Sequence, residues 1–210
     1  GLGDVYKRQY IKYSGTTKVA IAKRKVELEN NESILRTDSL FFDRQKQEVY
    51  YQTTGEITSQ DTVIRSQSGT YFVDDKKYEF ISDVVVNDSS FTIFSQRMDY
   101  YSDVRHAYFY GATTINGEGY DVYCYRGFFD SNLKKGYFQD RATVDYNLRK
   151  IKGDSIYFDD HIQYAAATRN VQISDTIGNN LIYGEYGEVF KHKDSCLLYT
   201  SPSPRDLRRS

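Results

Sequence analysis

Apolar residues recur along this chain at a constant interval of 29 residues. The first column of such residues contains Leu28, Ile57, Val86, Ile115, Val144 and Ile173. The residue two positions before each member is usually small or β-branched: Val26, Gly55, Val84, Thr113, Ala142 and Val171. Alternation with a period of two is typical of a β-strand with one buried face. The pattern therefore predicts a strand at the same place in each of six repeats.

Two further columns follow nearly the same interval. One contains the aliphatic residues Ile34, Ile64, Ile93, Val122, Ile151 and Ile182, and the other contains the aromatic residues Phe42, Phe72, Tyr101, Phe129, Phe158 and Phe190. We place their small deviations from 29 residues in turns, where insertions cost little free energy. An acidic residue follows the aromatic column closely, at Asp43, Asp74, Asp103, Asp130 and Asp159. Asp favours turns because its carboxylate accepts hydrogen bonds from nearby backbone amides.

These columns predict an all-β, elongated fold of about six stacked 29-residue repeats. That the repeats form a β-jellyroll with antiparallel strands is what the family resemblance given below implies. A single repeat of strand, turn, strand and turn cannot bury its apolar stripe alone, whereas stacked copies bury a continuous stripe. No segment has helical periodicity longer than a turn or two.

The composition agrees with this prediction and excludes several functions. The chain of 210 residues contains 21 Tyr and 12 Phe, and aromatic residues favour strands. Its net charge is −1 and it has no basic run, so we expect no nucleic-acid partner. No apolar window is long enough to span a membrane as a helix. Two cysteines are too few for a disulfide framework.

Both ends of the chain differ in character from its middle. The opening GLGDVYKRQ and the closing CLLYTSPSPRDLRRS resemble translated sequencing-adapter sequence. We therefore expect residues 1–9 and 196–210 to be artefactual flanks and residues 10–195 to form a single domain. For the same reason, the lack of a signal peptide says nothing about localisation.

Few residues suggest catalysis or metal binding. The three histidines, His106, His161 and His192, occur without an HExxH or CxxC pattern, and we interpret them as solvated turn residues. The recurrent aspartates suggest either turn chemistry or a ladder that binds calcium or hydrolyses glycosides. We favour turns, because every repeat carries the acid equally. Cys124 is expected to be a packed or half-exposed thiol, because a nucleophile would need a histidine partner. We predict no enzyme activity, no cofactor and no metal site.

A second set of tyrosines recurs before the valine-rich strands, at Tyr50, Tyr78, Tyr108, Tyr137 and Tyr164. A row of exposed rings is a possible stacking platform for sugars. Cross-strand aromatic ladders that stabilise a sheet explain the same pattern equally well. The sequence leaves these two interpretations open.

Three stretches resemble the repeat of the OstA/LptA lipopolysaccharide-transport family: KVELENNESILRTDSLFFD (25–43), DVVVNDSSFTIFSQRMDYYSD (83–103) and NVQISDTIGNNLIYGEYGEVF (170–190). The resemblance extends over about residues 19–193. It implies a periplasmic protein of a Gram-negative bacterium, folded as an open, V-shaped β-jellyroll that shelters the acyl chains of lipopolysaccharide between two sheets. It also implies stacking on like jellyroll domains through edge strands, including head-to-tail self-association, and no catalytic residue.

The combined prediction is non-catalytic binding and transport of lipopolysaccharide across the periplasm to the outer membrane. The side chains expected to line the lipid-binding trough are Leu28, Ile34, Phe42, Ile57, Ile64, Phe72, Val84, Val86, Ile93, Ile115, Val122, Phe129, Val144, Ile151, Phe158, Val171 and Ile173. The main alternative is a structural or adhesive β-solenoid of the cell envelope with a closed core, because the same apolar stripe serves both folds. A polysaccharide lyase or hydrolase on a β-helix is a third class, and it requires a singular cluster of acids or bases.

Overall fold

The protein consists of antiparallel β-strands in a computed structural model that describes residues 10–29, 33–59, 61–146, 148–175 and 181–190, and the backbone of residues 195–199. These described residues contain no helix. The predicted all-β class is confirmed. The chain divides into two compact units, and the division falls between Ile115 and Asn116.

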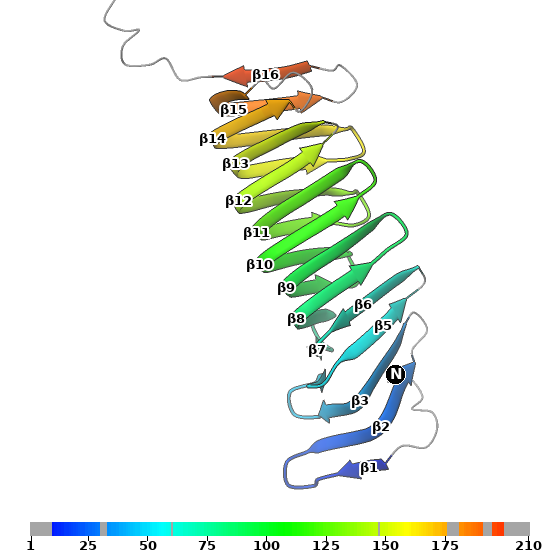
Figure 1. The fold of residues 1–210 in the computed structure, drawn as a ribbon. Coiled ribbons are helices and arrows are strands. Elements are labelled where there is room, and N and C mark those ends of the chain that lie inside the picture. Colours follow the sequence, from blue (N-terminus) through cyan, green and yellow to red (C-terminus); the bar gives the residue numbers. More distant parts are fainter. Residues whose placement is uncertain are drawn as a thin grey trace, which may run out of the picture. The chain divides into compact units, whose positions relative to one another are not determined.

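The described residues of the first unit form ten strands. Figure 1 draws them in blue to green. They are β1 Tyr10–Tyr13, β2 Val19–Glu29, β3 Ile34–Asp43, β4 Glu48–Tyr51, β5 Gly55–Ser59, β6 Thr62–Ser66, β7 Ser68–Phe72, β8 Lys77–Asn87, β9 Phe91–Tyr101 and β10 His106–Gly117, of which β10 crosses the division. The main path of paired strands is β1-β2-β3-β4-β7-β8-β9-β10. Strand β5 pairs with β3 and β6, and β6 pairs with β8.

The second unit contains six strands that pair in chain order, as in a meander. They are β11 Tyr120–Asp130, β12 Lys135–Tyr146, β13 Arg149–Asp159, β14 Tyr164–Asp175, β15 Leu181–Phe190 and β16 Ser195–Tyr199. Strand β16 extends into residues 196–199, which the sequence analysis left out of the fold. It pairs with β15 in a register that places Ser195 opposite Phe190.

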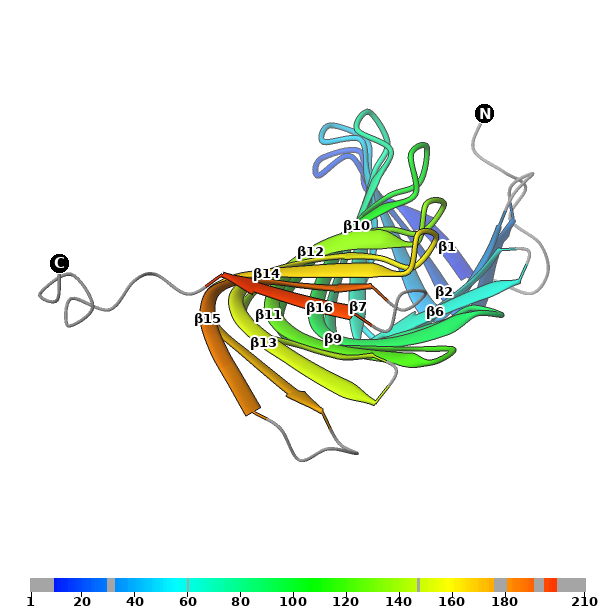
Figure 2. The same cartoon turned by 90° about the horizontal axis from the view of Figure 1, so that it is seen from above.

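The long strands bend in their middle. Pairs of consecutive residues with positive φ occur at 24–25, 82–83, 140–141 and 169–170, and the strand register shifts at each pair. Two residues there oppose one residue of the neighbouring strand, which is a β-bulge, and a bulge bends a strand. In Figure 2 the bend is visible in β11, β13 and β15.

Each bend divides a strand into two legs, which we call leg A and leg B. Leg A borders the acidic turns and includes residues 77–81 and 97–101, whereas leg B includes residues 84–87 and 91–95. In the middle of the first unit the legs are separate strands. There β4 and β7 form leg A, and β5 and β6 form leg B.

The acidic turns have the chemistry predicted for them. The carboxylate of Asp43 accepts hydrogen bonds from the backbone amides of Gln45 (2.9 Å) and Lys46 (3.1 Å). Asp130 accepts bonds from the amides of residues 132 and 133 in the same way. These turns end on a non-glycine residue with left-handed φ, and these residues again recur every 29 residues: Lys18, Gln47, Lys76, Arg105, Lys134 and Gln163.

The strand register corrects two of the predicted columns. Leu28 pairs with Leu35, and Leu35 pairs with Ile57, so Leu35 belongs to the inner row. Ile34 is its neighbour along the strand and points to the opposite face, because successive side chains alternate. Phe72 pairs with Lys77, while its neighbour Tyr71 packs on the inner cluster around Val49 and Tyr51.

With these corrections the inner rows keep an interval of 29 residues without the early deviations. The aliphatic row is Leu35, Ile64, Ile93, Val122 and Ile151, and the aromatic row is Phe42, Tyr71, Tyr100, Phe129 and Phe158. The prediction failed at Ile34, Phe72, Tyr101 and Phe190 because two adjacent apolar residues competed for one place. At the last of these the buried Val189 faces inward. The deviation at Ile182 is real, since Ile182 pairs directly with Ile173.

Candidate functional site

The inner face at the bend is lined by small residues from two columns. Sequence analysis identified only the column that begins at Val26. The second contains Thr37, Ser66, Ser95, Cys124 and Gly153, again 29 residues apart. Members of the two columns face each other in the register, as Thr37 does with Gly55 and Ser95 with Val84. The constant interval would have revealed the second column, but its mixed polarity hid it from a search for apolar residues.

Hydroxyl groups at the bend satisfy one another. The Oγ atom of Ser95 lies 2.8 Å from Oγ1 of Thr113, and both side chains are buried. The carbonyl oxygen of Arg97 lies 2.9 Å from Oγ of Ser95, and that of Gly111 lies 3.0 Å from Oγ1 of Thr113. Because each hydroxyl has one proton, one of them donates to the other hydroxyl and the second donates to its carbonyl. Buried hydroxyl groups need such partners. Both buried hydroxyl groups at the bend of the first unit therefore have hydrogen-bond partners.

The ring of Tyr51 occupies space on the inner face of the first unit that the glycines Gly55 and Gly69 leave free. Its hydroxyl lies 2.6 Å from Oγ of Ser66. A Cβ atom at Gly55 or Gly69 would overlap its ring. Burial raises the pKa of the Tyr51 hydroxyl. The two glycines are thus required by a close approach, and Tyr51 takes the space they leave.

The predicted lining residues divide into two groups by exposure. Those from the middle and end of the chain are buried: Ile57, Ile64, Val84, Val86, Ile93, Ile115, Val122, Phe129, Val144, Ile151, Phe158, Val171 and Ile173. Four near the start are half-buried: Leu28, Ile34, Phe42 and Phe72. Of these four, only Leu28 and Phe42 lie on the inner face, where Leu35 and Tyr71 join them as half-buried side chains. We call the inner face at Leu28, Leu35, Phe42 and Tyr71 the open segment.

In the second unit, aromatic rings from the two legs meet. Tyr120 and Tyr146 lie on leg B and pair with each other in the register of β11 and β12. Phe158 lies on leg A of β13, and its ring centroid is 4.8 Å from that of Tyr120 and 5.6 Å from that of Tyr146. The exposed fraction is 5% for Tyr120, 1% for Tyr146 and 0% for Phe158. We call this part of the inner face the closed segment.

Burial affects the acidity of groups in the closed segment. It raises the pKa of the Tyr146 hydroxyl to about 12, with a further contribution from the negative charge of Asp160. The thiol of Cys124, at the bend of β11, is completely buried, and this raises its pKa to about 12. A buried thiol with a raised pKa is a poor nucleophile. Of the two states that the sequence left open, packed or half-exposed, the structure shows the packed one.

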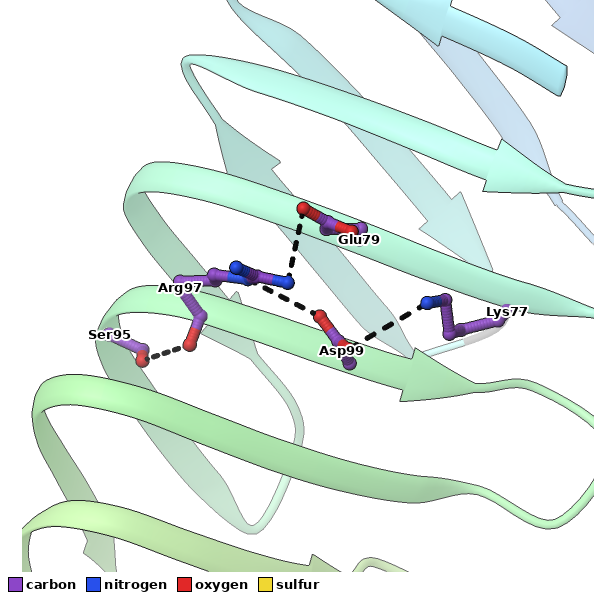
Figure 3. A network of polar contacts seen from close by, with 5 residues as sticks. All are labelled: Lys77, Glu79, Ser95, Arg97 and Asp99. Atoms are coloured by element: carbon purple, nitrogen blue, oxygen red, sulfur yellow. Dashed lines mark hydrogen bonds and ion pairs between the residues drawn. The ribbon is translucent and has the colours of Figure 1, made fainter.

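The outer face of leg A in the first unit carries a charged network (Figure 3). Arg97 lies between two acids, 3.3 Å from Glu79 and 3.6 Å from Asp99. Lys77 approaches Asp99 from the other side at 3.8 Å. Asp99 is 8% exposed, and the two cations balance its charge. The network joins β8 to β9.

The corresponding outer face of the second unit is aromatic. The rings of Tyr137 and Tyr157 are 4.9 Å apart, and those of Tyr164 and Phe190 are 4.8 Å apart. Tyr164 donates a hydrogen bond to Glu188 (2.8 Å). Here successive rings contact each other across paired strands. The structure therefore shows the cross-strand ladder that was one of the two interpretations of the tyrosines.

Among the described residues, no group of three or more His, Cys, Asp or Glu side chains is arranged to hold a metal ion. His161 is exposed and His106 is half-buried, while His192 lies outside the described residues. The part of the chain that the structure describes also contains no helix long and apolar enough to cross a membrane.

Comparison with known protein families gives a match to part of the chain. Residues 4–96 match the family described as OstA-like protein. Among solved structures, the chain is similar to that of LptH, the LptA-homologous periplasmic component of the conserved lipopolysaccharide transport device from Pseudomonas aeruginosa. The TM-score is 0.42 at 13% identity, and the similarity covers 47% of this chain and 76% of LptH. No curated protein matches the chain. The family match confirms the predicted resemblance over residues 4–96.

Proposed function

We propose that this protein binds lipopolysaccharide and carries it through the periplasm towards the outer membrane, with the acyl chains held against the inner face. The proposal rests on one coincidence. The family match over residues 4–96 contains the open segment, where Leu28, Leu35, Phe42 and Tyr71 are apolar, inward-facing and half-buried. A lipid that covers these half-buried side chains removes their remaining apolar surface from water, which is favourable.

The energetics of this binding need no specific pocket. Each methylene group transferred from water contributes about 0.8 kcal/mol. The inner rows offer Leu28 and Leu35 on leg B and Phe42 and Tyr71 on leg A, with no charged side chain among them. A row of similar contacts binds an acyl chain without fixing it at one position, which suits a carrier.

The edge strand β1 suggests which partners this carrier has. Strand β1 pairs with β2 and with no other described strand. Its remaining backbone groups suit pairing with a strand of another jellyroll domain. We propose like domains of a transport bridge as partners, including a second copy arranged head to tail.

The test uses neighbouring residues on opposite faces. A photocrosslinking amino acid is placed singly at Leu35 or Ile34, and at Tyr71 or Phe72, in cells that carry the full-length gene. The two members of each pair are neighbours in the chain and similar in size. Their side chains point to opposite faces of the sheet. We expect lipopolysaccharide adducts at Leu35 and Tyr71 and few at Ile34 and Phe72. Equal labelling within each pair, or no adduct at any site in a folded protein, would contradict the proposal.

A structural role with a closed core is the second candidate, and the closed segment favours it. Val144, Ile156 and Phe158 are each 0% exposed. A protein of this kind would show no lipid adduct at Leu35 either, so the same experiment separates the two functions.

A further inference from the structure

We infer that Tyr120 and Tyr146 close the inner face to acyl chains over β11–β13, because their rings on leg B meet the ring of Phe158 on leg A. This inference rests on the proposed function. It adds which part of the inner face is closed to lipid. It concerns contacts within the second unit alone.

The two tyrosines occupy positions at which the other repeats have different residues. Counted back in steps of 29, the equivalents of Tyr120 are Phe91, Thr62 and Ser33, and those of Tyr146 are Gly117, Asp88 and Ser59. Near the open segment these positions are therefore small and polar. A hydroxymethyl group is too short to reach leg A, whereas a tyrosine ring reaches it. The Tyr120 position also carries a ring one repeat earlier, at Phe91, which is 8% exposed, and it changes to Thr62 and Ser33 towards the open segment.

The side chains behind the tyrosines leave no room for a lipid. A Cβ atom at Gly136 would overlap the ring of Phe138, and one at Gly153 would lie 3.2 Å from Cβ of Ala167. Ala165 and Ala167 are 0% exposed although their side chains are small, so other groups approach them closely. An acyl chain can enter here only if the rings of Tyr120 and Tyr146 move away from Phe158.

Movement of the two tyrosine rings would break the contact between leg B and leg A at Phe158 alone. Tyr120 and Tyr146 are adjacent in the register, and both contact the same ring of Phe158. Loss of either tyrosine ring removes one of the two contacts and exposes Val122 or Val144 behind it. The remaining backbone pairing of β11, β12 and β13 does not involve these rings. We therefore expect the variants to keep their strands.

The experiment compares two crosslinking sites in the full-length protein exposed to lipopolysaccharide. In the otherwise unchanged protein we expect adducts at Leu35 and at least about tenfold fewer at Val144. In Tyr146→Ala or Tyr120→Ala we expect the Val144 adduct to rise at least about fivefold, with the Leu35 adduct unchanged. Tyr146→Phe, which keeps the ring, and Tyr137→Ala, which removes a ring that is 53% exposed on the same strand, are controls and should leave Val144 unlabelled.

Three outcomes are decisive. Equal adducts at Val144 and Leu35 in the unchanged protein would overturn the inference, and this comparison does not depend on whether any tyrosine variant folds. A silent Val144 in folded Tyr120→Ala and Tyr146→Ala proteins would also overturn it, while the Leu35 adduct would leave the proposed function intact. If Leu35 is silent as well, the proposed function itself fails.

Discussion

The open and closed segments carry the same rows of inward-facing side chains, yet the rows are half-buried in the first and buried in the second. Phe42 and Phe158 are equivalent members of the aromatic row. Phe42 remains half-buried, whereas Phe158 is completely buried beneath Tyr120 and Tyr146. The repeat thus defines which face is apolar. The residues at the free end of leg B differ between the two segments, with Ser33 and Ser59 near the first and Tyr120 and Tyr146 in the second.

The first prediction separates the two segments by their contribution to stability. Phe158→Ala should lower the free energy of unfolding by about 3–5 kcal/mol, because it leaves a cavity beneath the two tyrosines. Phe42→Ala should cost about 1–2 kcal/mol, since part of that ring is already in water. Urea denaturation monitored by circular dichroism measures both. Similar losses for the two variants would show that the segments are equally closed.

The second prediction concerns the space that Tyr51 occupies in the first unit. Gly69→Ala places a Cβ atom against the Tyr51 ring, which its hydrogen bond to Ser66 holds in place. Overpacking of this kind costs about 1–3 kcal/mol. Denaturation measures the loss, and Gly15→Ala is the control because a Cβ atom there meets nothing within 4 Å. Combining Gly69→Ala with Tyr51→Ala should recover part of the loss, and a strictly additive double variant would refute the proposed overlap.

The repeat, the strands and the acidic turns were predictable from the sequence, because each depends on residues close together in the chain. The choice between Leu35 and Ile34, or between Tyr71 and Phe72, was not. Both members of each pair are apolar, and only the pairing with Leu28 or Lys77 decides which one faces inward. The closure was also hidden, since it requires a contact between Tyr120 and Phe158 across the two legs. Periodicity predicts which face of a strand is apolar, but it does not predict which residues of the other leg contact that face.

The third prediction uses pH to probe the closed segment. The pKa of the Tyr146 hydroxyl is raised from 10.0 to about 12, so the unfolded chain ionises first as the pH rises. The stability associated with this group is complete below pH 10 and is lost as the pH approaches 12. We expect the free energy of unfolding to fall less steeply over this interval in Tyr146→Phe than in the unchanged protein. Identical slopes would mean that the hydroxyl is not buried.

The fourth prediction has the smallest effect and tests whether the segments differ anywhere except on the inner face. Lys76 and Lys134 end equivalent acidic turns, with φ values of 50° and 49°. Glycine adopts this left-handed conformation at less cost than lysine, so Lys76→Gly and Lys134→Gly should each stabilise the protein by about 0.5–1 kcal/mol. Denaturation midpoints compare the two variants. Because the turns have the same conformation, we expect equal gains. Unequal gains would place part of the difference between the segments in the turns, away from the tyrosines.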